Sequence, residues 1–118
     1  MDHQLYLEKL KASINILSDI LDTENYGMCI VDREGRIVQW NYERFFHLKE
    51  GDVLGLPVTQ VLENTRLHIV AQTGKKELFQ LQKINGNNVI ANRIPIIHDG
   101  EIIGAAGTII FKDTKELG

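Results

Sequence analysis

Three apolar segments near the C-terminal end, separated by two short turns, constrain the fold of this chain more than any other feature. Glu77 to Ile84 leads into Asn85-Gly86-Asn87, a strong signal for a hairpin turn. Val89 to Ile97 follows, and His98-Asp99-Gly100 turns the chain into Glu101 to Phe111. Because connections this short join antiparallel strands, the sequence predicts three antiparallel strands in succession.

A second pair of strands precedes these three. Tyr26 to Val31 and Arg36 to Trp40 are short apolar segments, and the turn Asp32-Arg33-Glu34-Gly35 between them ends on glycine. Helical patterns fill the chain between the second and the third strand. Five antiparallel strands with helices gathered between them predict an α+β fold, in which short helices cover one face of the sheet.

Three short helices are expected in the middle of the chain. Asn41 is suited to cap a first helix that runs through Glu43, Phe45 and Phe46. Gly51 to Gly55 is a predicted tight connector, and Val58 to Leu62 is a predicted short helix after Pro57.

The last of these helices has the clearest boundaries. Asn64 or Thr65 can cap its start, and Gly74 supplies a left-handed end. Its apolar face consists of Leu67, Val70 and Ala71.

An extra helix is predicted ahead of the sheet, from about His3 to Asp22. Leu5, Ile16 and Ile20 lie outside its main apolar stripe, so this helix is apolar on more than one side. It either packs on its own domain alone, or it is shared with a second subunit, an alternative that also allows packing on its own sheet. The main stripe alternates spacings of three and four, like a short coiled-coil seam, and is the predicted dimerisation surface: Leu7, Leu10, Ile14, Leu17 and Leu21.

The last strand carries four consecutive small residues, Gly104-Ala105-Ala106-Gly107, within a segment that is apolar on both faces. A strand of this kind is typical of the centre of a sheet. Small side chains leave space above the sheet, and either a closely packed helix or a bound molecule fills that space. The sequence leaves both alternatives open.

Composition restricts the function. Thirteen Lys and Arg against sixteen Asp and Glu give a net charge of −3 over 118 residues, so we expect no direct binding to nucleic acid. The single cysteine, Cys29, excludes an intrachain disulfide and a thiolate metal cage. We expect no signal peptide, and no apolar stretch in the sequence is long enough to span a membrane. The prediction is a one-domain cytoplasmic protein.

Two parts of the chain resemble a PAS domain. The segment from Val31 to Ile37, followed by Trp40-Asn41, is similar to that family's first hairpin and to the asparagine that opens its first helix. Gly104 to Thr108, ending in Phe111-Lys112-Asp113, resembles its last strand. The resemblance covers about residues 24–113.

Two further segments narrow the resemblance. Val61 to Val70 with Thr73-Gly74, and Ala91 to Ile96, are similar to the sensory PAS domains that precede the AAA+ module of bacterial sigma-54-dependent transcriptional activators. The resemblance implies a sheet with a helical cleft that senses a signal and passes it to an effector, often through a dimer. It also implies AAA+ and DNA-binding domains elsewhere in the full-length protein.

Cofactors are not expected. Some PAS sensors hold haem through a histidine on the helix before the third strand, but His68 in that helix projects to the side of the apolar face. The flavin-binding relatives need a cysteine after an asparagine on the middle helices, whereas Cys29 lies in the first strand. No metal site is expected, because the histidines are scattered: His3, His47, His68 and His98.

Enzymatic activity is not expected either. The only serines, Ser13 and Ser18, lie on the first helix and belong to no nucleophile motif. The glycines of the last strand enter a strand rather than the start of a helix, so they do not form a phosphate loop.

Some polar residues are candidate ligand contacts, each with an ordinary structural alternative. Arg66 could pair with an acidic ligand group or with Glu63. Asn92 would need a partner if its apolar neighbours Ile90, Ile94 and Ile96 faced inward. The candidates are Arg66, His68, Asn92 and Thr108, and structural roles are predicted for Asn41, Gly35 and Gly74.

The predicted organisation is an N-terminal helix over residues 1–23, a PAS sensory domain over 24–113, and the start of a linker at 114–118. The predicted function is to bind a small-molecule signal, to dimerise, or both, and so to control an attached sigma-54-dependent activator. The alternative is a ligand-free interaction module, for which a histidine kinase is a possible host protein.

Overall fold

The computed structural model describes residues 2–20, 26–42 and 46–111. In chain order its elements are α1 (His3–Ile20), β1 (Tyr26–Asp32), β2 (Ile37–Trp40), α3 (Glu50–Val53), the 3-10 helix η1 (Val58–Gln60), α4 (Leu67–Thr73), β3 (Glu77–Ile84), β4 (Asn87–His98) and β5 (Glu101–Phe111).

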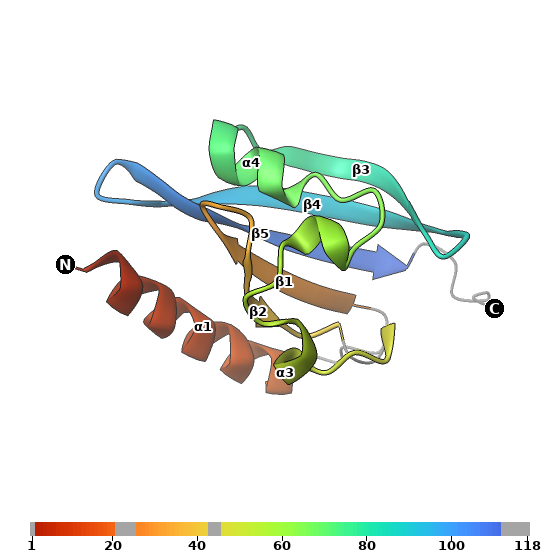
Figure 1. Cartoon of the computed structure of the whole chain (residues 1–118), viewed down its shortest axis with the longest axis horizontal. Coiled ribbons are helices and arrows are strands. Elements are labelled where there is room, and N and C mark those ends of the chain that lie inside the picture. Colours follow the sequence, from red (N-terminus) through yellow and green to blue (C-terminus); the bar gives the residue numbers. More distant parts are fainter. Residues whose placement is uncertain (1, 21–25, 43–45, 112–118) are drawn as a thin grey trace.

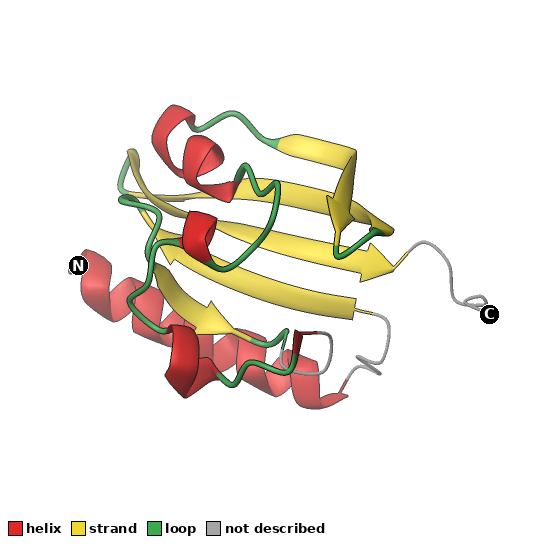
Figure 2. Ribbon diagram, turned by 45° about the vertical axis from the view of Figure 1, so that its right-hand side comes forward, coloured by secondary structure: helices red, strands yellow, loops and turns green. Residues whose placement is uncertain are grey.

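The strands form one antiparallel sheet in the order β2-β1-β5-β4-β3, with β5 at its centre (Figure 1). The α+β prediction is confirmed. Figure 2 shows α3, η1 and α4 on one side of the sheet and α1 on the other. The two faces are called the inner face, under the short helices, and the outer face, under α1.

Each face has its own apolar cluster, because side chains alternate along the strands. Cys29, Val31, Ala105 and Ile109 belong to the inner cluster, with residues of α3, η1 and α4. The outer cluster joins α1 to β1, β4 and β5, and its buried members are Leu7, Ile14, Ile30, Ile96 and Ile103.

Two predicted local structures are wrong in type or extent. The expected connector at Gly51 to Gly55 overlaps the helix α3, since the Asp52 carboxylate accepts the backbone N–H of Lys49 at 3.1 Å and Val53 is buried. The helix expected over Val58 to Leu62 is a single 3-10 turn that ends at Gln60.

The start of α4 also differs from its prediction. Arg66 occupies the N-cap position and makes no side-chain cap bond, while the Thr65 hydroxyl accepts the N–H of Leu67 at 3.1 Å. Asn64 instead donates its side-chain amide to the carbonyl of Lys83. Gly74 ends the helix with φ 75°, and a Cβ there would lie 2.6 Å from Ile102 Cδ1.

Some predictions lie outside the described residues. These are most of the helix expected after Asn41, which involves Glu43 and Phe45, and the linker from residue 114. Leu21 of the predicted seam also lies there, and the side chain of Leu17 is not described.

Candidate functional site

Among the described residues, the inner face of the sheet and the short helices pack directly against each other. Gly107 lies under α4, where an added Cβ would be 3.0 Å and 3.3 Å from the two terminal methyl carbons of Leu67. Tyr42 closes another side, since its buried hydroxyl donates to the carbonyl of Gly107 at 3.1 Å. The space above Gly107 in β5 is therefore filled by a closely packed helix, which is the first of the two alternatives.

Gly104 has a different reason to be small. An added Cβ would lie 2.2 Å from the carbonyl oxygen of Val31, because β1 approaches β5 closely at this point. This glycine therefore permits strand pairing and leaves no space for a ligand.

A small cavity remains in the inner cluster. Its volume is about 10 Å³, which is room for a single water molecule. Its walls combine apolar side chains such as Leu62 and Leu67 with polar groups of Tyr42, Gln82 and Arg93. A metabolite therefore needs the helices to move before it can enter.

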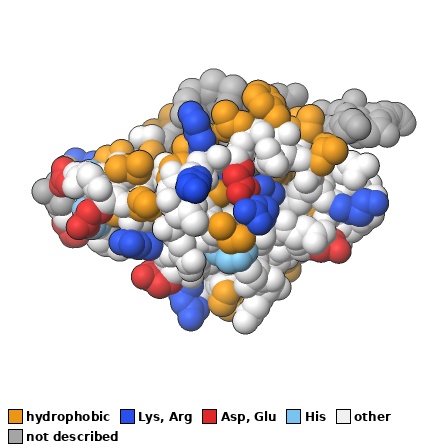
Figure 3. Space-filling view, turned by 90° about the horizontal axis from the view of Figure 1, so that it is seen from above, with side chains coloured by type: hydrophobic (Ala, Val, Ile, Leu, Met, Phe, Trp, Pro, Cys, Tyr) orange, Lys and Arg blue, Asp and Glu red, His pale blue; other side chains and the backbone are white. Residues whose placement is uncertain are grey.

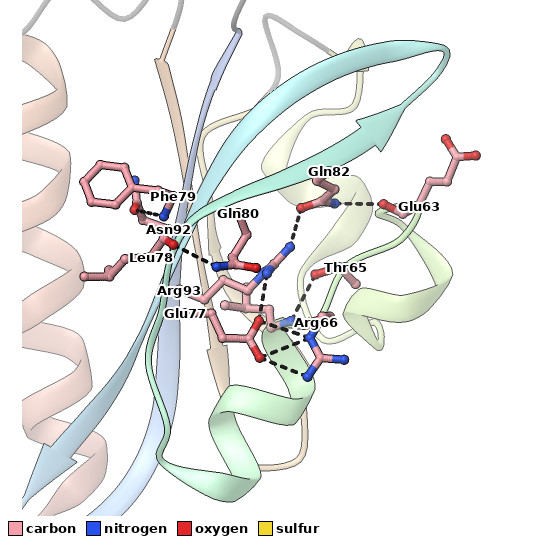
Figure 4. A network of polar contacts seen from close by, with 11 residues as sticks. Glu63, Thr65, Arg66, Glu77, Leu78, Phe79, Gln80, Gln82, Asn92 and Arg93 are labelled. Carbon is pink, nitrogen blue, oxygen red and sulfur yellow. Dashed lines mark hydrogen bonds and ion pairs between the residues drawn. The ribbon is translucent and has the colours of Figure 1, made fainter.

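Arg93 carries the charge at the centre of this region, and its side chain is only 4% exposed. Its guanidinium donates to Glu77 Oε1 at 2.8 Å and to Gln82 Oε1 at 2.9 Å (Figure 4). Gln82 is also buried and donates its own amide to the carbonyl of Glu63 at 2.8 Å. This network satisfies a buried charge and links β3, β4 and the segment before α4.

Arg66 binds the same carboxylate from the solvent side. Its guanidinium makes a two-pronged contact with Glu77, with Nη2 to Oε2 at 2.9 Å, and the Arg66 side chain is 53% exposed. Glu77, rather than the predicted Glu63, is its acidic partner. The Arg66 hydrogen bond, assisted by Arg93, lowers the pKa of the Glu77 carboxyl against the opposing effect of desolvation. Figure 3 shows adjacent acidic and basic side chains on the surface over α4 and β3.

Asn92 and Thr108 do not join Arg66. Alternation puts their side chains on the outer face, so the two residues border the cavity through their main chains. The side-chain oxygen of Asn92 accepts the N–H of Phe79 at 2.9 Å (Figure 4). The partner that Asn92 needs is thus a backbone group of β3.

His68 lies on α4, half-buried, beside the β1–β2 turn. Its Cβ is 3.0 Å from the position of a Cβ on Gly35, whose φ of 84° lies in the left-handed region. The Nδ1 atom of this ring is buried and has no hydrogen-bond partner among the described residues. It packs against the turn and does not line the cavity.

Asn41 ties the end of β2 to the start of β1. Its side-chain oxygen accepts the N–H of Met28 at 3.0 Å, and its own N–H donates to the Met28 carbonyl at 3.0 Å. The four candidate ligand residues are therefore spread over two faces of the sheet, and the structure does not bring them together.

Sequence reasoning missed Arg93, Glu77 and Gln82. A signal was present, because Arg93 occupies the same alternating position as the apolar Val89 and Ala91. A charged residue at such a position must find a buried partner, and opposite-charge or amide residues on the neighbouring strand are candidates.

The outer face is only partly covered. Leu7 and Ile14 of the predicted seam are buried against the chain's own sheet, with Leu10 beside them. Apolar side chains of β3, β4 and β5 remain exposed next to α1. We call these the outer patch: Phe79, Leu81, Ile94 and Ile110.

Phe79 is the most exposed member of the outer patch, at 79%. It lies in a bulge between Glu77 and Gln80, where its φ is +57°. A left-handed backbone costs an L-residue with a bulky side chain about 1–2 kcal/mol. The structure thus holds an aromatic ring in solvent at the expense of backbone strain.

Within the ranges that the structure describes, no group of three or more His, Cys, Asp or Glu residues is arranged to hold a metal ion. No helix in the described ranges is both long and apolar enough to cross a membrane. Cys29 is a free, buried thiol, and its burial raises the pKa of that thiol.

The five-stranded antiparallel sheet with short helices over one face defines a domain of the PAS class. The PAS fold family matches residues 15–110, which is most of the chain. This chain belongs to the PAS family.

Two curated relatives are sensor proteins. The sensor protein CitS of Halalkalibacterium halodurans is 35% identical over 102 residues, which is 83% of this chain and 19% of the relative. A probable C4-dicarboxylate sensor kinase of Bacillus subtilis is 28% identical over 94 residues, or 78% of this chain and 17% of that protein. The chain thus spans less than a fifth of either relative.

Solved structures show the same fold. The PAS domain of Bordetella pertussis BvgS has a TM-score of 0.64 at 23% identity and covers 90% of this chain and 91% of its own. The PAS domain of the histidine kinase ThkA has a TM-score of 0.63 at 20% identity, with 73% and 98% covered.

Proposed function

We propose that this domain is the relay module of a sensor histidine kinase and works without a bound metabolite, through contacts with neighbouring protein. The observation that carries this proposal is the filled cleft. Within the part of the chain that the structure describes, Leu67 occupies the space over Gly107, and the cavity beside them, about 10 Å³, has room for one water molecule.

The relatives support a histidine kinase as the effector attached to this domain. Both curated relatives are named as sensors and one of them as a sensor kinase. The similarity to the sigma-54-dependent activators has no such support, so the AAA+ and DNA-binding partners stay a prediction, as does the cytoplasmic location. A regulatory role of this kind needs no catalytic group in this domain.

The relay would act through α1. This helix buries Leu7 and Ile14 on the outer face, while Ile16 on the same helix is 61% exposed. A neighbouring subunit or domain that contacts the exposed side favours one packing of α1 on the sheet over another. Such a shift in population can pass through the domain without a ligand in the cleft.

Native mass spectrometry and thermal unfolding of the purified chain test the ligand-free reading. We expect the mass of the polypeptide alone and no change in Tm with a C4-dicarboxylate such as succinate. A ligand at 100 times its Kd would stabilise the domain by about 2.7 kcal/mol. A retained small molecule, or a saturable rise in Tm, would contradict the proposal and favour a metabolite sensor.

The outer patch is the proposed dimer surface, together with the exposed side of α1. We expect Phe79→Asn to weaken self-association about tenfold or more, since exposed aromatic anchors dominate interfaces. The monomer should be as stable as the wild type or more stable, because asparagine tolerates the left-handed backbone at this position.

Light scattering after size-exclusion chromatography measures this prediction, with Leu56→Asn as the control. Leu56 is also an exposed apolar residue, at 39%, but it lies between α3 and η1, outside the outer patch. A wild-type chain that stays monomeric at high concentration would reject the dimer. Equal weakening by both variants would reject the surface.

A further inference from the structure

Two histidines hold the first turn of α1 to the turn between β4 and β5. Nδ1 of His3 lies 2.9 Å from Nδ1 of His98, a hydrogen bond between side chains 95 residues apart. Nε2 of His3 lies 2.6 Å from Oε1 of Glu101. The ring of Tyr6, one helical turn further along α1, stacks on His98 with ring centroids 4.3 Å apart and 23° between the planes.

The pair is partly shielded from water. The His98 side chain is 11% exposed and that of His3 is 39% exposed. Leu7, which follows Tyr6, is buried on the outer face. The histidine contact therefore fixes the end of the helix that begins the outer apolar cluster.

The hydrogen bond between the two Nδ1 atoms requires that one of these two atoms, and not both, carries a proton. When both rings are neutral, His98 donates to His3, and His3 donates its other N–H to Glu101. When one ring is charged, His3 donates both to Glu101 and to His98, and the contact persists. When both rings are charged, two N–H groups face each other at 2.9 Å and the hydrogen bond is lost.

The surrounding charges are mixed. Glu101 on β5, and Asp32, Arg33 and Glu34 of the β1–β2 turn, line a groove of about 210 Å³ with His3. The His3 hydrogen bond and charge, with a smaller effect of Arg33, lower the pKa of the Glu101 carboxyl. Asp99 Oδ2 lies 3.7 Å from His98 Nδ1, and Asp2 and Tyr6 are the remaining titratable groups on this turn of α1. These carboxylates place negative charge beside the rings, but they do not separate the two opposed Nδ1 atoms.

We propose that the His3–His98 pair is a proton-sensitive latch, which fixes the N-terminal end of α1 to the sheet and releases it when both rings become charged. The released state binds one proton more than the latched state. Acidification therefore weakens docking of α1, by up to tenfold for each pH unit once the second proton binds. Histidine is the side chain that ordinarily changes charge between about pH 5 and pH 8, and this range is the one to test.

The test combines two measurements on the whole chain between about pH 8 and about pH 5. Nitrogen-15 NMR of the imidazole rings reports the tautomer and charge of each histidine. Hydrogen exchange, expressed as protection factors that correct for intrinsic exchange, reports docking of α1. We expect the second of the two rings to become charged only as protection of the first turns of α1 falls.

His98→Gln removes the second titrating ring and should make the protection of α1 independent of pH, even if docking is weaker throughout. His47→Asn is the control, because His47 is exposed, lies outside the pair, and has a φ of 58° that asparagine tolerates. This control should keep the wild-type pH dependence. Three results would each overturn the latch. The first is two charged rings while α1 stays protected from exchange, and the second is protection in the wild type that does not change with pH. The third is a pH dependence in His98→Gln equal to that of the wild type. The NMR measurement needs no variant, so the test holds even if a substitution disturbs folding.

Discussion

Replacement of Glu77 by glutamine is expected to lower the free energy of unfolding by about 2–3 kcal/mol, which is below the usual cost of breaking a fully buried pair. The carboxylate is the charged partner of Arg93, whose side chain is 4% exposed. An amide leaves that guanidinium buried without an opposite charge. The cost is reduced because the Glu77 side chain is 20% exposed and water reaches it. Urea denaturation with a constant m value measures the change.

Arg66→Gln is the matched control, since it removes the other guanidinium from the same carboxylate. The Arg66 side chain is 53% exposed, so water replaces the lost contact and stability should hardly change. Equal losses in the two variants would show that burial of Arg93 does not set the cost.

The pH dependence of unfolding checks the same carboxylate. The pKa of Glu77 is lowered in the folded state, so its charge stabilises the fold above about pH 4. That contribution disappears as the pH falls through the folded pKa. The difference in stability between wild type and Glu77→Gln should therefore shrink in acid.

Gly104→Ala is expected to be the more damaging of two glycine substitutions in β5, with a loss of about 3 kcal/mol or more. The added Cβ would lie 2.2 Å from the Val31 carbonyl oxygen, so the backbones of β1 and β5 must separate. Thermal unfolding should show a fall in Tm of roughly 10 °C or more for a domain of this size.

Two other glycines provide the controls. Gly107→Ala should cost only about 1–2 kcal/mol, because the methyl carbons of Leu67 that it meets at 3.0 Å and 3.3 Å can rotate aside. Gly51→Ala should be neutral or stabilising, since Gly51 lies in α3 and an added Cβ meets nothing within 4 Å. A smaller loss for Gly104→Ala than for Gly107→Ala would contradict the packing described for β5.

The sheet could be predicted because its signals are local. Asn85-Gly86 and Asp99-Gly100 both adopt the left-handed backbone that tight hairpins need, and they set the antiparallel order of the last three strands. The helix α3 was missed because four residues around a glycine give no helical period. It depends on one carboxylate contact and on burial of Val53, which only the tertiary structure supplies.

The candidate site was predicted less well, because its partners come from different strands. Asn92 and Arg93 are neighbours in sequence, yet they face opposite sides of the sheet. The bulge at Leu78 and Phe79 adds one residue to β3 opposite Asn92. Counting the alternation of faces back from the β3–β4 turn therefore puts Glu77 on the wrong face of the sheet. Arg66 was recognised as a charged residue in need of a partner, but Glu77 rather than Glu63 reaches it.

The bulge in β3 also affects how copies of this domain can meet. β3 lies at one margin of the sheet, where an unpaired strand offers backbone groups to any other extended chain. An extra residue near the start of that strand interrupts the regular row of donors and acceptors and twists the strand away from a straight line. Continuous polymerisation of one sheet onto the next is thereby discouraged. Side-chain contacts between faces, which can rearrange without breaking main-chain bonds, become the easier way for two domains to associate.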